Sequence, residues 1–151
     1  MDSLYPKQGT FIKYQQEWQI VSYYNRLSEF KITPIGYNKI VFLGNSITEG
    51  GGDWNKRFGT KNIVNRGISG DITQGIIVRI NEIIYYKPAA VFLLIGINDI
   101  FNSDILNRDK ITADYVAGNI IKIANIIKKQ SPSTKLFVQT ILPVNPESYF
   151  K

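Results

Sequence analysis

Short apolar runs rich in β-branched residues, separated by longer helical patterns, are the feature that most constrains the fold of this chain. The strongest run covers residues 90–95, where every side chain is apolar. Similar runs cover residues 39–43 and 135–142, and a weaker one covers residues 62–65. Strands that are apolar on both faces are typical of a parallel sheet with helices on each side.

Helical patterns lie between these runs. Residues 14–30 predict an amphipathic helix, and residues 112–130 predict another. The apolar face expected for the first of these helices consists of Trp18, Val21, Tyr24 and Leu27. A capping box, with Asp71 as N-cap and Gln74 reaching back, predicts a further helix that ends before Pro88.

The alternation of strands and helices predicts a single α/β domain. A chain of 151 residues is long enough for one domain with a real core and too short to argue for two. Within it we expect residues 1–36 to form a helical lead-in and residues 37–151 to form the α/β domain.

Composition excludes several classes of function. The net charge is +6, but basic residues are scattered and adjacent only at Lys56-Arg57 and Lys128-Lys129, so no nucleic-acid partner is expected. The absence of cysteine rules out disulfides and thiolate catalysis, and with no histidine either we expect no metal and no cofactor. No apolar run could span a bilayer, and no signal peptide is visible. The compartment stays open between the cytoplasm and, after signal removal, the periplasm or exterior.

Polar loops follow three of the predicted strands, at residues 44–46, 65–71 and 96–99. Open α/β sheets bind ligands at the carboxyl ends of their strands. The loops would offer a nucleophilic hydroxyl from Ser46, a backbone N–H from Gly70 and a side-chain amide from Asn98. Hydrogen-bond donors aimed at a carbonyl oxygen are what an oxyanion hole requires.

Each of these residues also has a plain structural reading. Ser46 could cap a helix, Gly70 could allow a turn, and Asn98-Asp99 could form a turn or cap. It is their occurrence in order, each at a strand's carboxyl end, that favours a site. A Walker loop is excluded because Glu49-Gly50 stands where glycine-lysine would be needed.

Four segments together resemble the SGNH, or GDSL-like, hydrolases, in the branch that includes platelet-activating-factor acetylhydrolase subunits and bacterial sialate or carbohydrate O-acetylesterases. They are GNSITEG at 44–50, NRGISGD at 65–71, GIND at 96–99 and ILPVN at 141–145. The resemblance runs from about residue 39 to residue 145.

The resemblance implies that Ser46 is the nucleophile and that its N–H, the Gly70 N–H and the Asn98 side chain form the oxyanion hole. Asn45, which stands where many members have aspartate, would be a tolerated variant, and Asp71 and Asp99 would support the site. The implied fold is a flavodoxin-like three-layer sandwich with a parallel sheet. The implied substrate is a small acyl ester, most directly an acetyl ester such as an acetylated carbohydrate.

The chain departs from the family at its end. The D-x-x-H block, which supplies the base beyond a fifth strand, is absent, and so is any histidine. We therefore expect a sheet truncated before its last strand and a fragment with little activity of its own, because losing one triad member leaves about 10³–10⁴-fold catalysis over water. Asp71 or Asp99 could be proposed as a substitute base, but we expect neither to serve, because a carboxylate with an ordinary pKa of about 4 is a feeble base for a serine hydroxyl.

Loss of a strand would also expose an apolar sheet edge at residues 136–138, open to a complementing C-terminal fragment or to a second copy of the chain. The leading hypothesis is an SGNH-type serine esterase. The alternative is a catalytically inactive SGNH-like protein that binds acylated sugars or a protein partner. A third hypothesis is a flavodoxin-like domain that binds a small anion at the helix start beside Gly70.

Overall fold

The computed structural model describes residues 2–106 and 110–141 of the chain. Four parallel strands form one sheet in the order β2-β1-β3-β4. The strands are β1 (Ile40–Gly44), β2 (Ile63–Gly67), β3 (Ala90–Leu94) and β4 (Lys135–Val138). All four predicted strands are confirmed, although β4 ends four residues earlier than expected. This is the sheet of a flavodoxin-like α/β fold, as the sequence predicted.

The register places the carboxyl ends of three strands side by side. Gly44, the last residue of β1, pairs with Gly67 of β2 on one side and with Leu94 of β3 on the other. The chain goes from β1 to β2 and then crosses to β3 on the opposite side of β1. Such a reversal opens a crevice at the carboxyl ends, where this fold class binds ligands.

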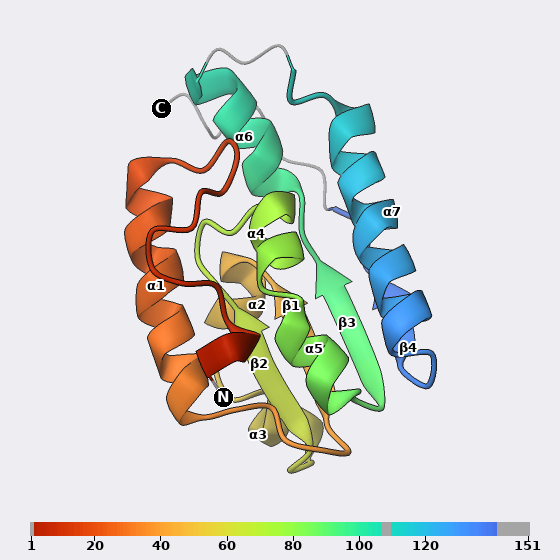
Figure 1. Ribbon diagram of the computed structural model, residues 1–151. Coiled ribbons are helices and arrows are strands. Elements are labelled where there is room, and N and C mark those ends of the chain that lie inside the picture. The colour runs from red at the N-terminus through yellow and green to blue at the C-terminus, as the bar shows by residue number, and fades with distance from the viewer. Residues whose placement is uncertain (1, 107–109, 142–151) are drawn as a thin grey trace.

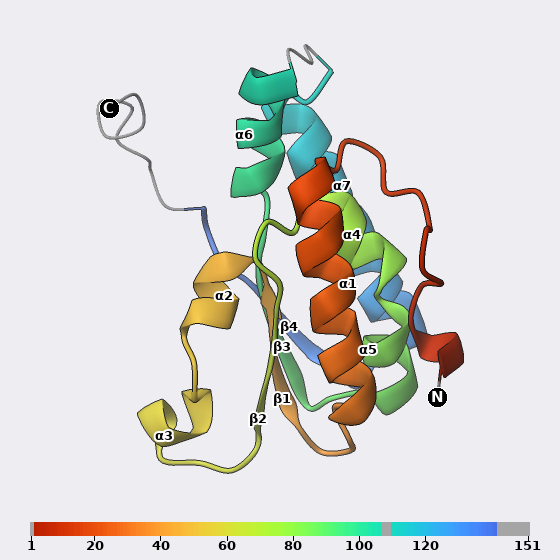
Figure 2. The same ribbon diagram turned by 90° about the vertical axis from the view of Figure 1, so that its left-hand side faces the viewer.

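Helices lie on both faces of the sheet (Figures 1 and 2). One face carries α1 (Glu17–Ile32), α4 (Thr73–Val78), α5 (Asn81–Tyr86) and α7 (Ala113–Gln130). The other carries α2 (Ser46–Gly50) and α3 (Trp54–Phe58). A short 3-10 helix, η1 (Asp2–Leu4), begins the described chain, and α6 (Ile97–Leu106) rises from the carboxyl end of β3.

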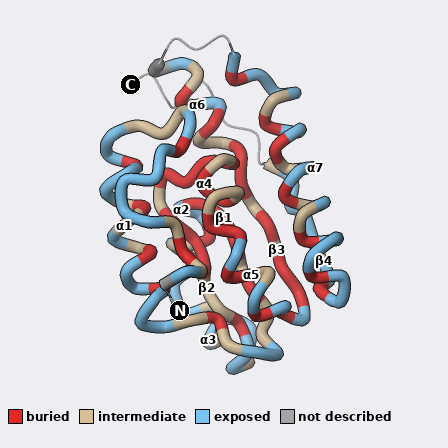
Figure 3. The backbone as a smooth tube through the Cα atoms, in the orientation of Figure 1, coloured by how far each residue is buried: buried red, intermediate tan, exposed pale blue. Residues whose placement is uncertain are grey.

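The main core lies between the sheet and the larger helical layer, where the buried positions gather (Figure 3). Alternate side chains of β1 and β3 point into it, among them Val41, Leu43, Val91 and Leu93. Isoleucines from α4, α5 and α7 meet them, and each fully buried side chain contributes roughly 1.5–3 kcal/mol. A second cluster joins α1 to the loop after β2 through Leu27, Phe30, Ile68 and Ile72.

The opposite face of the sheet is more open. A cavity of about 600 Å³ lies there, and its largely apolar lining includes the aromatic side chains Phe42, Trp54, Phe58 and Phe92. Phe137 of β4 stacks on Phe92 with ring centroids 4.7 Å apart, yet remains 47% exposed. Within residues 2–106 and 110–141, α2 and α3 cover the β1–β2 part of this face, and no helix covers β4 on this side of the sheet (Figure 2).

The predicted apolar face of α1 is only partly right: Leu27 is buried and Tyr24 packs against the second core cluster, but Trp18 and Val21 face outward. Trp18 and Val21 are 54% and 60% exposed, whereas the buried side chains are Gln19, Tyr23, Leu27 and Phe30. A spacing of three residues drifts around a helix of 3.6 residues per turn, while the four-residue spacing from Gln19 to Leu27 stays on one side. The helix also begins at Glu17 and not at residue 14, because Tyr14 has a positive φ of 68°.

The remaining helices agree in part with the sequence. Helix α7 matches its predicted range, with the Thr112 side chain accepting a hydrogen bond from the N–H of Tyr115. The helix expected before Pro88 is divided into α4 and α5, and α6 was not predicted. The ILPVN segment lies outside the described residues from residue 142 onward, and the boundary at residue 36 stays a prediction.

Candidate active site

The turn after β1 exposes Ser46. Asn45 is the N-cap of α2, and its buried side chain accepts a hydrogen bond from the N–H of Ile47 at 3.0 Å. Capping is thus the task of Asn45, so Ser46 is left as the first residue of the helix with an exposed side chain. No described residue hydrogen-bonds to the Ser46 hydroxyl or to its N–H. The hydroxyl is free to meet a ligand.

The loop after β2 turns at Gly70. The N–H of Asp71 donates to the carbonyl of Ile68 at 3.0 Å, and Gly70 has a φ of +79° inside this turn. A side chain at Gly70 would be strained and would lie 2.5 Å from the ring of Trp18, so glycine is required here. Its N–H finds no acceptor among the described residues, which leaves it available as a donor.

The first turn of α6 brings Asn98 to the same loop. Its side-chain amide donates to the backbone carbonyl of Asp71 at 2.9 Å, next in sequence to Gly70. An asparagine amide carries two hydrogens, and within residues 2–106 and 110–141 this bond uses one of them. The structure therefore joins the loops after β2 and β3 that the sequence assigned to one site.

Asp71 is not the helix cap that the sequence predicted. The N-cap of α4 is Ile72, which has no capping side chain, and the Gln74 amide donates to Tyr115 and Asn119 instead. The Asp71 carboxylate is buried against Arg79, with the Arg79 Nε donating to Oδ2 at 2.9 Å. A buried arginine competes for the carboxylate more strongly than a local backbone N–H can.

Asp99 caps α4 from another element. Its carboxylate accepts from the N–H of Thr73 at 2.9 Å and from the Thr73 hydroxyl at 2.5 Å. A negative charge at a helix N-terminus is favourable, and this contact ties α6 to α4. Sequence analysis could not assign this role because the two residues are 26 positions apart.

Burial changes the acidity of both aspartates. Loss of solvent raises the pKa of Asp71 to about 6, although Arg79 acts in the opposite direction. Burial likewise raises the pKa of Asp99 to about 6, against the effect of its bonds from Thr73. The expectation of an ordinary pKa near 4 is therefore wrong. Each carboxylate is nonetheless engaged in the contacts just described.

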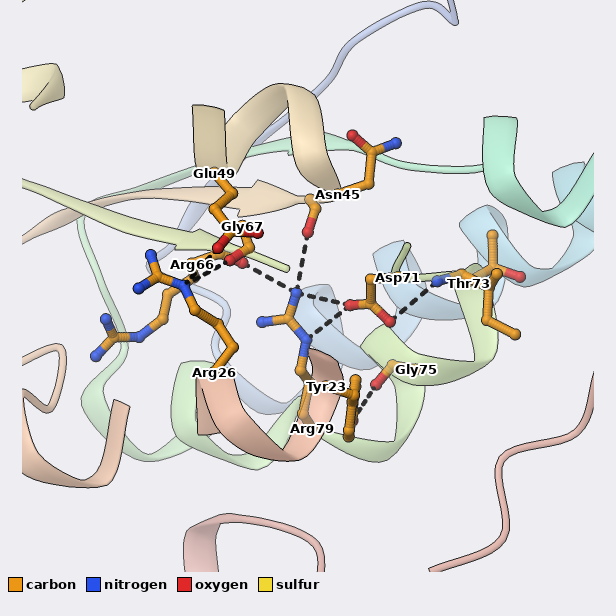
Figure 4. Close-up of polar contacts among 12 residues, drawn as sticks. Tyr23, Arg26, Asn45, Glu49, Arg66, Gly67, Asp71, Thr73, Gly75 and Arg79 are labelled. Atoms are coloured by element: carbon orange, nitrogen blue, oxygen red, sulfur yellow. Dashed lines mark hydrogen bonds and ion pairs between the residues drawn. The ribbon is translucent and has the colours of Figure 1, made fainter. Parts of the chain in front are cut away.

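Arg79 is a residue of the site that sequence analysis missed (Figure 4). Besides Asp71, its guanidinium donates to the carbonyl of Gly44 at 3.2 Å and to that of Arg66 at 2.9 Å. It thus holds the carboxyl ends of β1 and β2 to the loop that carries Gly70. The only sequence signal is a charged residue among the apolar positions of the predicted helix.

Glu49 and Asn65 were also missed. The Glu49 carboxylate accepts from both the N–H and the hydroxyl of Ser69, each at 2.6 Å. The Asn65 amide donates to the carbonyls of Thr48 and Glu49 at 3.1 Å. Glu49 lies in the segment at 44–50 and Asn65 in the segment at 65–71, and their contacts fasten α2 to the end of β2.

The described residues contain no cluster of three or more acidic, histidine or cysteine side chains suited to a metal ion. No helix within the described part of the chain is long and apolar enough to cross a membrane.

A parallel α/β sheet with a free serine after β1, a glycine N–H after β2 and an amide after β3 defines the class of SGNH-type hydrolase domains. The sequence model of the GDSL-like Lipase/Acylhydrolase family matches residues 42–150, and the chain belongs to this family.

Known proteins resemble the chain in both sequence and structure. Platelet-activating factor acetylhydrolase IB subunit alpha2 of Homo sapiens is 30% identical over 92 residues, covering 60% of this chain and 36% of that protein. Subunit alpha1 of Rattus norvegicus is 27% identical over 110 residues, covering 70% of this chain and 44% of that protein. The chain thus spans less than half the length of these curated relatives.

Among solved structures, a protein of Streptococcus pneumonia assigned as a platelet activating factor superposes with a TM-score of 0.67 at 27% identity, covering 89% of this chain and 64% of that one. An acetylxylan esterase of Geobacillus stearothermophilus gives a TM-score of 0.53 at 24% identity, covering 68% and 60%, and shows the likeness of the fold. These names favour the hydrolase hypothesis over the inactive binding protein.

Proposed function

We propose that this chain supplies the nucleophile and the oxyanion hole of a serine esterase that cleaves small acyl esters, acetyl esters above all. The observation that carries the proposal is the state of Ser46: its exposed hydroxyl and its N–H have no partner among the described residues, because Asn45 does the capping. A serine that capped the helix would spend its hydroxyl on a backbone N–H, and here the Asn45 side chain does so instead.

In the proposed reaction the Ser46 oxygen attacks the carbonyl carbon of the ester, and a base accepts the hydroxyl proton. The carbonyl oxygen becomes negative and is stabilised by the N–H groups of Ser46 and Gly70 and by the side-chain amide of Asn98. Collapse of the tetrahedral intermediate expels the alcohol, which takes up a proton. Water then hydrolyses the acetyl-serine and regenerates Ser46.

The base has to be a group other than histidine of this chain, since the sequence contains none. Asp71 and Asp99 have the raised pKa values of candidate bases, but their oxygens are engaged by Arg79 and by Thr73. We expect imidazole added to the solution to act as the base in place of the absent side chain.

The proposed acyl group is acetate because that is what the names of the relatives share. One group of relatives consists of platelet-activating factor acetylhydrolase subunits, and the structural neighbours include acetylxylan esterases. The alcohols in these names differ, one belonging to a lipid and the other to a carbohydrate. The proposal accordingly specifies the acetyl ester and not the alcohol.

The test is hydrolysis of p-nitrophenyl acetate by the mass-verified 151-residue chain, with Ser46→Ala as the control. Both proteins are assayed without imidazole and at increasing imidazole, and the rate of the variant is subtracted at each concentration. We expect a small Ser46-dependent rate that grows with imidazole. Equal rates for the two proteins at every imidazole concentration would show that Ser46 is not a working nucleophile.

The proposed partners follow from the outer edge of β4. This strand pairs with β3, and no other described strand pairs with it. Its Phe137 and Val138 are about half exposed, at 47% and 49%. An apolar edge with unpaired backbone groups favours strand addition, by a complementing C-terminal segment or by a second copy of the chain.

A further inference from the structure

We propose that Glu49 is a positioning residue for the oxyanion hole, and that its carboxylate fixes the Gly70 N–H relative to Ser46. The inference deepens the proposed esterase function and rests on it. Glu49 lies one helical turn after Ser46 in α2, while Ser69 immediately precedes Gly70. A bond between Glu49 and Ser69 therefore connects the two backbone segments that carry the oxyanion donors.

The contact is direct and two-fold. One carboxylate oxygen of Glu49 accepts from the Ser69 N–H at 2.6 Å and from the Ser69 hydroxyl at 2.6 Å. Hydrogen bonds to a carboxylate are shorter and stronger than neutral ones. The Ser69 N–H is held in this way, and the Asp71 N–H donates to the Ile68 carbonyl at 3.0 Å, so the peptide that carries the Gly70 N–H lies between two hydrogen-bonded neighbours.

The backbone of α2 packs against the end of β2 at the same place. A Cβ atom at Gly67 would overlap the backbone of Thr48 and Glu49, so the absence of a side chain allows the close approach. The Asn65 side chain accepts from the Gly67 N–H at 2.9 Å and donates to the Glu49 carbonyl. Glu49 is thus held on its backbone side while its carboxylate holds Ser69.

Arg26 of α1, which also pairs with Glu29, partly offsets the charge of this carboxylate. Its Nε lies 3.5 Å from the second oxygen of Glu49 and donates to the Gly67 carbonyl at 3.1 Å (Figure 4). A negative charge beside an oxyanion hole would oppose the developing oxyanion unless it were compensated. The Glu49–Arg26 separation is longer than the bonds to Ser69, so the role of Glu49 is to bind the turn and not to form a surface ion pair.

Three variants separate this role from general stability. Glu49→Ala removes the acceptor, Glu49→Gln keeps an acceptor oxygen without the charge, and Ser69→Ala keeps the N–H bond but loses the hydroxyl. Glu17→Ala, an exposed glutamate of α1, is the matched control. Each is assayed for Ser46-dependent hydrolysis of p-nitrophenyl acetate with added imidazole. Amide hydrogen exchange of Ser69 is followed by NMR in the same samples, with Val91 of β3 as the internal reference.

We expect Glu49→Ala to lower kcat by roughly ten- to hundredfold with KM within about twofold, as for a displaced transition-state donor. Glu49→Gln should recover most of the loss, and Ser69→Ala should fall between them. The Ser69 amide should exchange about tenfold faster in Glu49→Ala, while Val91 exchanges at an unchanged rate.

An unchanged kcat in Glu49→Ala, or an equal loss in Glu49→Gln, would overturn the assignment. Failure of the esterase proposal looks different, because then the wild-type chain shows no Ser46-dependent rate at all. In that case the exchange measurement decides alone whether Glu49 holds the turn: equal Ser69 exchange in wild type and Glu49→Ala refutes the contact.

Discussion

The side-chain amide of Asn98 donates a hydrogen bond to the backbone carbonyl of Asp71 at 2.9 Å, and so ties the first turn of α6 to the residue that follows Gly70. This bond leaves one amide hydrogen for a ligand. It also sets the direction in which that hydrogen points, since an amide group is planar. Asn98 therefore contributes both a donor and its orientation.

We expect Asn98→Ala to lower the Ser46-dependent rate on p-nitrophenyl acetate by about 10²–10³-fold, the usual effect of removing one oxyanion donor. The measurement is kcat with added imidazole. Asn125→Ala, at an exposed position of α7, is the control and should leave kcat within about twofold of wild type. A loss of less than about threefold in Asn98→Ala would remove Asn98 from the site.

Arg79 should be important for stability, because it is buried and bonds to three segments. Replacing it with methionine leaves the buried carboxylate of Asp71 unpaired and removes the bonds to the Gly44 and Arg66 carbonyls. We expect Arg79→Met to lower the free energy of unfolding by about 3–5 kcal/mol, measured by urea denaturation. The double variant Asp71→Asn/Arg79→Met should recover part of this loss, and no recovery would mean that the carbonyl contacts dominate.

Asp99 should make stability depend on pH. Burial raises its pKa from 3.8 to about 6 in the folded chain, so the native state binds a proton more readily than the unfolded state between these values. Its contribution to stability is then fully present below about pH 4 and is lost as pH rises through 6, by at most about 3 kcal/mol.

The measurement for Asp99 is the free energy of unfolding in urea at several pH values from 4 to 7. Relative to Asp99→Asn, the wild-type chain should lose stability across this range, because the asparagine cannot ionise. Asp114→Asn, at an exposed position of α7, is the control. A wild-type profile parallel to that of Asp99→Asn would contradict the raised pKa.

Gly70→Ala tests the turn that presents the second donor. The substitution places a Cβ on a backbone with φ of +79° and brings it 2.5 Å from the Trp18 ring. Gly36 has a similar φ of +73° but open space around it, so Gly36→Ala reports backbone strain alone, about 1–2 kcal/mol. We expect Gly70→Ala to cost more stability than Gly36→Ala in thermal unfolding, and equal costs would show that Trp18 moves aside.

The edge of β4 should promote self-association. Val138→Lys places a charge on the exposed end of this strand, the device by which natural edge strands avoid pairing. We expect the average mass of the sedimenting species to increase with protein concentration for the wild-type chain. Val138→Lys should keep the mass of a monomer at every concentration. Sedimentation velocity over a hundredfold concentration range, about 1–100 μM, checks this. A wild-type chain that is monomeric throughout would refute it.

The agreement between sequence and structure is best where local patterns decide. The apolar runs around Val41 and Val91 are short and rich in β-branched residues, and these properties alone favour strands. Helix α7 has a clear apolar stripe and a Thr112 cap, so its bounds were predicted almost to the residue. The buried face of α1 was predicted wrongly at its first turn. There the apolar Trp18 is half exposed, whereas the polar Gln19 is buried and its side chain is satisfied by hydrogen bonds with Asn102.

The sequence by itself determined the parallel α/β class, the family and the residues proposed to carry the chemistry, because these depend on short-range periodicity and on motifs of four to seven residues. Tertiary structure alone decided how the motifs are held together. Arg79 bonds to Asp71 across 8 positions of the sequence. Asp99 bonds to Thr73 across 26 positions, and Glu49 bonds to Ser69 across 20. Folding buries Arg79 and Asp99, where each charge needs a partner that no local pattern specifies, and it half-buries Glu49 beside Ser69.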